Sequence, residues 1–253
     1  MQLRDNFILS LQFLTIINIR NDTKVASGQI DKERLGKSTI FFPLVGVFIG
    51  FILVITSRVA SLWLPVSVAD AMVMIVLIIV TGGLHIDGFA DTIDGFAGGR
   101  DKDSVLRIMK DSRIGTFGVA GLVMLLLTKY ISIQNTQIDV KSWILASMPV
   151  FGRWSVLPLG FFYRYARMEE GTGKVFAESI EWREFIMGTI LSLAIILLLL
   201  GSSGFIILSV IFFITLLIGR YSEKRIGGIT GDVFGATIEI NELITIILSL
   251  SLF

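Results

Sequence analysis

Long apolar runs are the feature that most constrains how this chain can fold. Residues 38–64 and residues 184–219 contain one charged residue each, over lengths that are sufficient to cross a bilayer. Hydrophobic residues occupy 53% of the 253 positions and charged residues only 17%, a balance that a soluble domain of this length would not tolerate. The sequence therefore predicts an all-α fold, namely a polytopic integral membrane helical bundle.

The apolar runs predict about seven transmembrane helices and one N-terminal interfacial helix. The interfacial helix covers residues 6–19, where the apolar stretch is too short to span. The expected spans are residues 38–64, 69–84, 114–133, 143–162, 184–200, 205–219 and approximately 232–253. We treat residues 1–253 as one domain, with functional loops at 82–118 and 219–242.

The distribution of lysine and arginine predicts the orientation in the membrane. Of the 22 basic residues, 18 lie in four segments, at 1–40, 87–113, 163–184 and 219–237. A topology of seven spans places all four segments on one side, which the positive-inside rule identifies as the cytoplasm. We therefore expect a multi-pass protein of the cytoplasmic (inner) membrane, with a cytoplasmic N-terminus and active site. The net charge of +1 argues against nucleic acid as a partner.

The stretch between residues 82 and 118 is rich in acids that the apolar runs do not explain. It holds six aspartates, and the pentapeptide Ile-Asp-Gly-Phe-Ala occurs in it twice, seven residues apart. On a helix, Asp87, Asp91 and Asp94 would share one face and would repel one another without a cation among them. Such oxygen ligands favour a hard divalent metal, most often Mg²⁺ where phosphates complete the shell. The alternative is a solvated loop whose acids are neutralised by its own lysines and arginines.

A second acidic segment begins with the sequence GGITGDVFGA at residues 227–236. Its glycines allow a ligand to approach the backbone, and Thr230 or Asp232 could cap the final helix. The N-terminus of that helix would favour a phosphate. The helix must begin near Asp232 to be long enough to span, which draws Glu239 and Glu242 into the interior of the bundle. The alternative is a plain helix cap followed by a solvated first turn.

Basic residues before the third span could hold phosphate. Lys110 and Arg113 are placed to bind phosphate oxygens, and Asp111 between them could join a metal shell. The alternative is a positively charged anchor on the cytoplasmic side.

Two single residues stand out for their setting. His85 is the only histidine and lies two residues before Asp87, where it could act as general base for a hydroxyl nucleophile or simply donate a hydrogen bond to a neighbour. Arg153 lies within the apolar fourth span and should pair with an acid or with a ligand phosphate.

Three of these segments together resemble a known family. The segments GGLHIDGFADTIDGFAGG, RIMKDSRIGTFG and GGITGDVFGATIE are similar to those of cobalamin synthase, the adenosylcobinamide-GDP ribazoletransferase of bacteria and archaea. The similarity covers essentially the whole chain. It implies Mg²⁺-dependent transfer of the cobinamide phosphate from adenosylcobinamide-GDP to α-ribazole or its 5′-phosphate, with release of GMP, at the cytoplasmic face of a helical membrane bundle.

The resemblance implies roles for the residues singled out above. The catalytic and Mg²⁺-binding aspartates would be Asp87, Asp91 and Asp94, with His85 or a carboxylate deprotonating the ribazole hydroxyl. The further metal ligands would come from Asp111, Asp232 and Glu239. The substrate would contact Lys110, Asp111, Arg113, Arg153, Thr230 and Gly231. The large corrin substrate requires a wide cavity that faces the cytoplasm, and the lipid bilayer is a further partner. A homo-oligomer and the docking of other nucleotide-loop enzymes are left open.

Other functions remain as alternatives. Residues 91–95 match the start of the CDP-alcohol phosphatidyltransferase signature D-x-x-D-G-x-x-A-R, but glycines occupy the positions of its Ala and Arg. A prenyl-diphosphate transferase is a related alternative. A cation transporter would place its acids near the midplane and often contains an inverted repeat. Here the acids crowd one side, and only Glu239, Glu242 and Arg153 favour transport.

Overall fold

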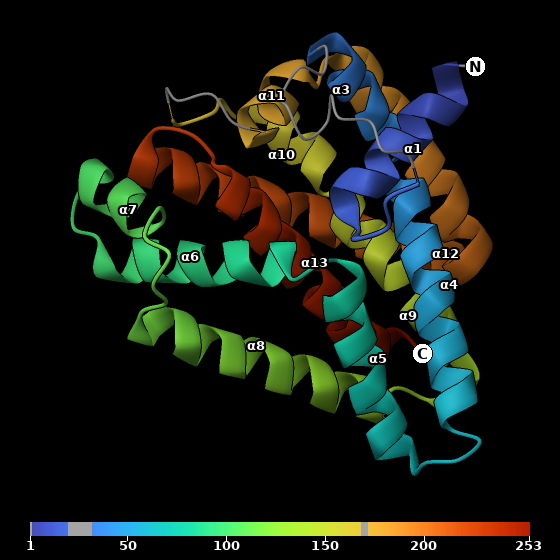
Figure 1. Ribbon diagram of the computed structural model, residues 1–253. Coiled ribbons are helices and arrows are strands. Elements are labelled where there is room, and N and C mark those ends of the chain that lie inside the picture. The colour runs from blue at the N-terminus through green and yellow to red at the C-terminus, as the bar shows by residue number, and fades with distance from the viewer. Residues whose placement is uncertain (1, 20–31, 168–171) are drawn as a thin grey trace.

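A computed structural model describes residues 2–19, 32–167 and 172–253 of the chain (Figure 1). Helices make up its architecture, and no β-strand occurs within these ranges. The helices are α1 (Gln2–Leu14), α3 (Lys32–Ser38), the 3₁₀-helix η1 (Thr39–Phe41), α4 (Phe42–Ala60), α5 (Val66–Val80), α6 (Leu84–Gly98), α7 (Lys102–Ile108), α8 (Thr116–Asn135), α9 (Ile138–Trp154), α10 (Val156–Phe162), α11 (Thr172–Ser179), α12 (Trp182–Ile226) and α13 (Gly231–Leu252). The prediction of an all-α membrane bundle is confirmed.

Five stretches of the described chain are long and apolar enough to cross a membrane, or six if α5 and α6 count as one bent span. One of the five is α12, whose 45 residues would extend about 68 Å at about 1.5 Å per residue, twice the bilayer core. Gly201 interrupts it with a left-handed φ of 58°. The expected number of seven is reached when α5 and α6 count as one bent span and the two arms of α12 are counted separately. The protein is a multi-pass membrane protein.

A sharp bend between α5 and α6 departs from the expected straight second span. The two helices meet at 88°, because Gly82 and Gly83 take φ values of 62° and 71°, which glycine adopts without steric cost. The acidic stretch therefore turns away from the axis of α5 (Figure 1). Most of the segment predicted as a functional loop at 82–118 is helical, in α6, α7 and the start of α8.

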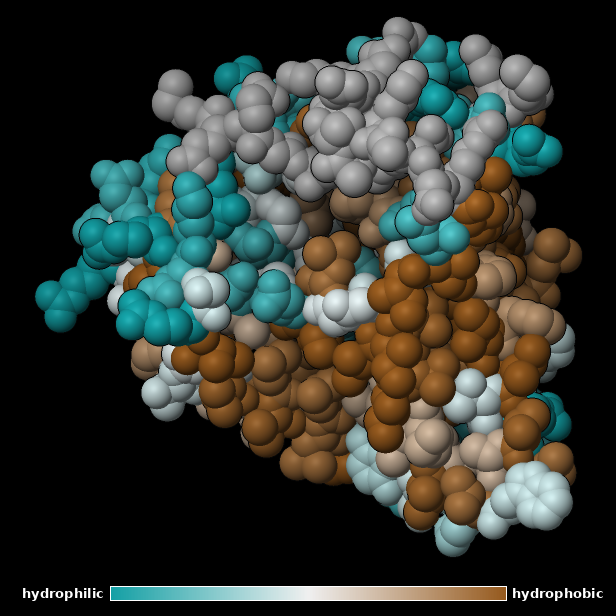
Figure 2. Space-filling view, in the orientation of Figure 1, coloured by the Kyte–Doolittle hydropathy of each residue, from teal (hydrophilic) through white to brown (hydrophobic). Residues whose placement is uncertain are grey.

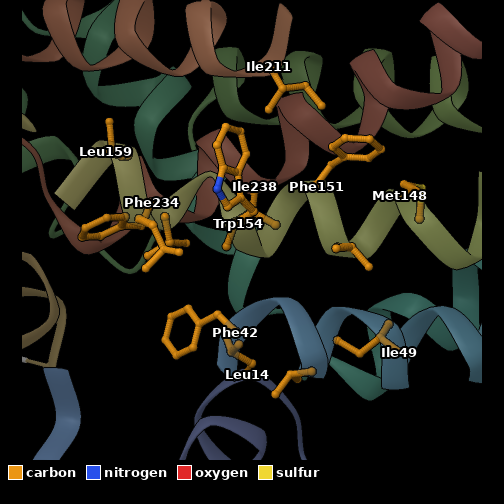
Figure 3. Packing of buried hydrophobic residues seen from close by; sticks show 14 of the residues in the cluster. Leu14, Phe42, Ile49, Met148, Phe151, Trp154, Leu159, Ile211, Phe234 and Ile238 are labelled. Atoms are coloured by element: carbon orange, nitrogen blue, oxygen red, sulfur yellow. The ribbon is translucent and has the colours of Figure 1, made fainter. Parts of the chain in front are cut away.

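Close packing of α4 on α9 forms the most extensive helix contact of the bundle. Gly46 and Gly50 of α4 face the backbone of α9, and a Cβ on Gly46 would lie 2.7 Å from the Cα of Val150. The pair of small residues thus allows the close approach expected of membrane helices. Trp154 and Phe151 of α9 are buried beside this contact and fill the centre of the core (Figure 3).

Hydrophobic side chains also cover much of the outer surface. Figure 2 shows them over α4, α5 and α8, while hydrophilic residues gather around α7. Phe51 of α4 and Met124 of α8 are 61% and 63% exposed. Exposed apolar surface of this extent suits contact with lipid.

Candidate active site

The site is built where α6 crosses the start of α13. A Cβ on Gly88 would lie 3.0 Å from the Cα of Asp232, and one on Gly235 would lie 3.0 Å from the His85 carbonyl oxygen. The two glycines therefore let the backbones touch, and the acids of α6 come close to the acid of α13. Asp87 and Asp232 line the same cavity. Asp87, Asp232 and Asp94 are the acids whose charges act on Asp91.

The second copy of the repeated pentapeptide, at residues 93–97, makes contacts that differ from those of the first copy. Its aspartate, Asp94, is 7% exposed and accepts hydrogen bonds from the backbone N–H groups of Gly115 (2.6 Å) and Gly118 (2.7 Å) at the start of α8. Its glycine, Gly95, gives room to Met109 beyond α7. Both oxygens of Asp94 thus accept hydrogen bonds that hold α6 against α8, and metal ligation by this residue stays a prediction.

A short backbone pairing brings Arg167 to the crossing. Ile229 pairs with the segment before Arg167 through two hydrogen bonds, from Ala166 N–H to the Ile229 carbonyl and from Ile229 N–H to the Arg164 carbonyl, both 2.8 Å. Gly228 is required here, because a side chain would overlap the Arg164 carbonyl. The guanidinium of Arg167 then donates to Asp232 Oδ2 at 2.8 Å.

The N-terminus of α13 orients the same carboxylate. Thr230 is the N-cap, as the sequence predicts, and its Oγ1 accepts from the N–H of Val233 at 3.3 Å. Its hydroxyl lies 3.2 Å from Asp232 Oδ2. Thr230 is fully buried and positions Asp232, whereas Gly231 lines the cavity. Contact of either residue with substrate stays a prediction.

A wide groove lined by basic side chains lies beside the crossing. We call it the cationic groove; its volume is about 820 Å³, and its charged lining consists of Lys102, Arg107, Lys110 and Arg167 with Asp103 and Asp111. Lys110 was predicted to bind phosphate, and its position is consistent with that role. Arg113 lies outside the groove lining, with its side chain 87% exposed and 2.8 Å from Asp111.

The pairing with Arg113 also decides the state of Asp111. Hydrogen bonds from the Arg113 side chain and backbone lower the pKa of Asp111 to about 2. This carboxylate is therefore an ionised partner of Arg113 in the lining of the groove, and its metal ligation stays a prediction.

A buried cluster of four charged residues lies deeper in the bundle. Lys129 donates to Glu239 at 2.6 Å and to Glu242 at 2.7 Å, and Arg153 donates to Glu242. All four are at most 4% exposed. The burial of Glu239 and Glu242 was predicted. The cluster balances its own charge, because Glu239 pairs with Lys129 and Arg153 pairs with Glu242, an acid being one of the two partners expected for Arg153. Metal ligation by Glu239 and contact of Arg153 with substrate stay predictions.

His85 contacts this cluster through Arg153. The Arg153 Nη2 lies 3.3 Å from His85 Nδ1. Arginine only donates, so Nδ1 accepts and the proton of the neutral ring resides on Nε2. In the described part of the chain, Nε2 has no hydrogen-bond partner. A nitrogen that already carries a proton is a donor, which disfavours the predicted role of His85 as general base.

The acids do not form a ready-made metal centre. No three His, Asp or Glu side chains among the described residues are gathered closely enough to hold a metal ion. The oxygen donors of Asp87, Asp91 and Asp232 nevertheless have the chemistry that Mg²⁺ prefers, and Asp232 pairs with Arg167, which lines the cationic groove. These three acids remain the predicted ligands.

Two residues of the site were missed from sequence. Arg167 lies in the basic segment 163–184, which was read only as a sign of orientation. Tyr165 lies close to Gly231 and Arg167, and burial raises the pKa of its hydroxyl above the usual value. Both residues lie in the connection after α10, which carries no recognisable motif. Its backbone pairing with Ile229 brings them to the site.

Comparison with known proteins gives one consistent result. Residues 6–250 match the family model described as cobalamin-5-phosphate synthase. Similar proteins include the adenosylcobinamide-GDP ribazoletransferase of Clostridium tetani, 33% identical over 98% of this chain and 96% of the relative. Those of Alkaliphilus metalliredigens and Geotalea daltonii are 35% and 36% identical, over 94% of this chain and 92% and 94% of the relatives. No solved structure matches.

Proposed function

The chain belongs to the cobalamin-5-phosphate synthase family of transferase enzymes, and we propose that it is an adenosylcobinamide-GDP ribazoletransferase. It transfers the cobinamide phosphate from adenosylcobinamide-GDP to α-ribazole or its 5′-phosphate in the presence of Mg²⁺. The products are GMP and adenosylcobalamin or its 5′-phosphate. The reaction takes place at the cytoplasmic face of the inner membrane, where the basic segments lie.

The observation that carries this proposal is the ion pair between Arg167 and Asp232. Arg167 lines the cationic groove, and Asp232 lines a separate, mainly apolar cavity. Their hydrogen bond of 2.8 Å therefore lies at the boundary between a place for a diphosphate and a place for a second, less polar substrate. A transferase requires such an arrangement, because its two substrates must meet at the reacting phosphorus.

The residues at this boundary suit attack on a diphosphate. A ribose hydroxyl attacks the phosphorus on the cobinamide side; the new P–O bond forms as the bond to the GMP oxygen breaks, and the hydroxyl proton passes to a carboxylate of the Asp87, Asp91 and Asp232 group. Arg167 and Lys110 hold the phosphate oxygens. Asp87, Asp91 and Asp232 would hold Mg²⁺, which neutralises charge on the bridging and leaving oxygens.

The buried cluster removes the support for transport. Glu239 and Glu242 were the acids that favoured a cation path, yet both accept from Lys129 and the four charges balance. A translocated cation would have to displace these internal partners. These contacts favour a transferase over a transporter.

The proposal is tested with the purified protein in detergent. Adenosylcobinamide-GDP, α-ribazole and Mg²⁺ are added, and GMP and the corrin product are followed by chromatography, with and without a chelator. Asp87→Asn and Arg167→Ala are compared with Arg220→Ala, an exposed arginine that pairs with Glu223 and lines neither cavity.

We expect Mg²⁺-dependent formation of GMP and corrin product. Arg167→Ala should lower kcat/KM about tenfold or more, since it removes charge-assisted hydrogen bonds, and Asp87→Asn should lower it further. Arg220→Ala should behave as wild type. Folded wild-type protein that forms no product would overturn the assigned reaction. Full activity of Asp87→Asn and Arg167→Ala would leave the reaction but overturn the site.

A further inference from the structure

A polar pocket lies at the end of the bundle away from the crossing of α6 and α13. The end of α4, the start of α5, the end of α8 and the start of α9 form it, and its volume is about 410 Å³. We call it the distal pocket. The connection from α4 to α5 lies at the bottom of Figure 1, away from α6 and α7. The volume is within the range of about 300–1,000 Å³ that is usual for small-molecule sites.

The distal pocket gathers the basic residues that the four basic segments leave over. Four of the 22 lysines and arginines lie outside those segments. Lys129 and Arg153 belong to the buried cluster, and the other two, Arg58 and Lys141, both line the distal pocket. The described residues that line it include no aspartate or glutamate. Two cations from different helices therefore meet in a cavity without a carboxylate.

The guanidinium of Arg58 is the positive charge that this cavity leaves unbalanced. Its Nε and Nη2 donate to Ser142 Oγ at 3.1 and 2.9 Å, and it forms no ion pair within the described part of the chain. Lys141, by contrast, donates to both oxygens of the buried Asp70, at 2.9 and 3.1 Å. Asp139 is exposed on the first turn of α9 and does not line the pocket. An anion at Arg58 would balance the remaining charge.

The neighbouring groups are the donors that a phosphate group uses. Ser57 and Ser61 at the end of α4 contribute hydroxyl groups to the lining. Val66 and Ile138, the first residues of α5 and α9, line the pocket as well, and neither helix has a side-chain N-cap. The start of a helix carries N–H groups without an intrahelical partner and a partial positive charge. Arginine, hydroxyl groups and helix starts together favour a phosphate over a carboxylate-free neutral ligand.

Exposed apolar side chains continue the lining towards the outer surface. Leu62 and Ile138 line the pocket and are exposed, and Trp63, the neighbour of Leu62, is 84% exposed. Tryptophan is enriched at the level of the lipid headgroups. The apolar stretch of α4 also ends here. The distal pocket therefore lies where a headgroup phosphate and the first part of an acyl chain come together.

We propose that the distal pocket binds the headgroup phosphate of an anionic phospholipid. Arg58 and the Ser142 hydroxyl hold the phosphate oxygens, and the acyl chains lie along Leu62 and Trp63. The apolar rim favours a lipid over a free phosphate ion, which would leave that rim unused. A zwitterionic lipid offers the same phosphate but brings a cationic group close to Arg58. The pocket should therefore prefer phosphatidylglycerol, whose headgroup beyond the phosphate is uncharged, to phosphatidylcholine. This site is independent of the proposed reaction.

Native mass spectrometry of the full-length protein in neutral detergent tests the site. Phosphatidylglycerol and phosphatidylcholine with identical acyl chains are titrated separately, and the affinity of the first bound lipid is compared. The variants are Arg58→Gln, which removes the charge, and Ser142→Ala, which removes the hydroxyl that orients it. Arg220→Gln is the matched control, because it removes the same charge from an exposed arginine outside the distal pocket. Inorganic phosphate in excess serves as competitor.

Wild-type protein should bind its first phosphatidylglycerol about tenfold more tightly than phosphatidylcholine, the effect of charge-assisted hydrogen bonds. Arg58→Gln should lose this preference, Ser142→Ala should reduce it severalfold, and Arg220→Gln should keep it. Inorganic phosphate should not displace the lipid. Size-exclusion chromatography shows which variants remain folded, and Ser142→Ala decides the matter if Arg58→Gln does not fold.

Three results would overturn the proposal. The first is equal affinity of wild type for the two lipids. The second is a preference that survives unchanged in the folded variants of Arg58 and Ser142, because the lipid would then be bound at the basic segments at the other end of the bundle. The third is displacement of phosphatidylglycerol by inorganic phosphate, which would assign the distal pocket to a free anion.

Discussion

Removal of Lys129 from the buried cluster is the perturbation with the largest expected effect on stability. Its ammonium group is 1% exposed and donates to two carboxylates, those of Glu239 and Glu242. Arg153 donates only to Glu242 within the cluster. In Lys129→Met the two carboxylates face one cation, so one buried negative charge is left without a partner.

The magnitude follows from that imbalance. Breaking a buried ion pair by removal of one partner costs about 3–5 kcal/mol, because the remaining charge stays desolvated. For a chain of this size, about 1 kcal/mol shifts the midpoint of thermal unfolding by about 2–4 °C. We therefore expect Lys129→Met to lower the midpoint by on the order of 10 °C.

A paired variant separates charge balance from lost packing. Lys129→Met with Glu239→Gln again leaves equal numbers of buried acids and bases, since Arg153 and Glu242 remain paired. Both variants lose the same lysine methylene contacts. The double variant should therefore recover at least half of the midpoint lost in the single one.

Thermal unfolding in detergent measures both midpoints, with loss of monomeric protein on size-exclusion chromatography as the readout. Arg220→Ala, which breaks an exposed pair with Glu223, serves as the control and should unfold as wild type does. A Lys129→Met midpoint equal to that of wild type would refute the reasoning. A double variant less stable than the single one would show that the loss comes from packing and not from charge.

Three further predictions concern the backbone of the site. Gly228→Ala should overlap the Arg164 carbonyl and displace Arg167, so we expect a severalfold higher KM for adenosylcobinamide-GDP in steady-state assays. Asp94→Ala removes two acceptors at the start of α8 and should cost about 1–2 kcal/mol of stability, measured by thermal unfolding. An added methyl group at Gly83 would meet no other atom, but the positive φ of this position disfavours alanine. Gly83→Ala should therefore cost about 1 kcal/mol of stability in the same assay.

Features local in sequence could be predicted. The apolar runs predicted the membrane helices, and the separate spans expected at 184–200 and 205–219 correspond to the two arms of α12 on either side of Gly201. Thr230 was one of two predicted caps for α13, because the capping preference depends on a few neighbouring residues.

Contacts between distant segments could not be predicted in this way. Lys129 and Glu239 are 110 positions apart, and neither position reveals the other. Helical spacing placed Asp94 on the face of Asp87 and Asp91, but the start of α8 supplies two N–H groups that engage it. The pattern therefore indicated which residues share a helix face, whereas the partner of that face depended on the packing of other helices.

The buried cluster has a consequence for His85 that stability alone does not explain. Buried ion pairs add little net stability compared with apolar residues of the same volume. Apolar residues in their place, however, would offer nothing to the Nδ1 of His85, and the ring proton could then occupy either nitrogen. Arg153, held by Glu242, accepts no proton and so assigns the donor to Nε2. The charges within the membrane helices thus decide which ring nitrogen of His85 carries the proton.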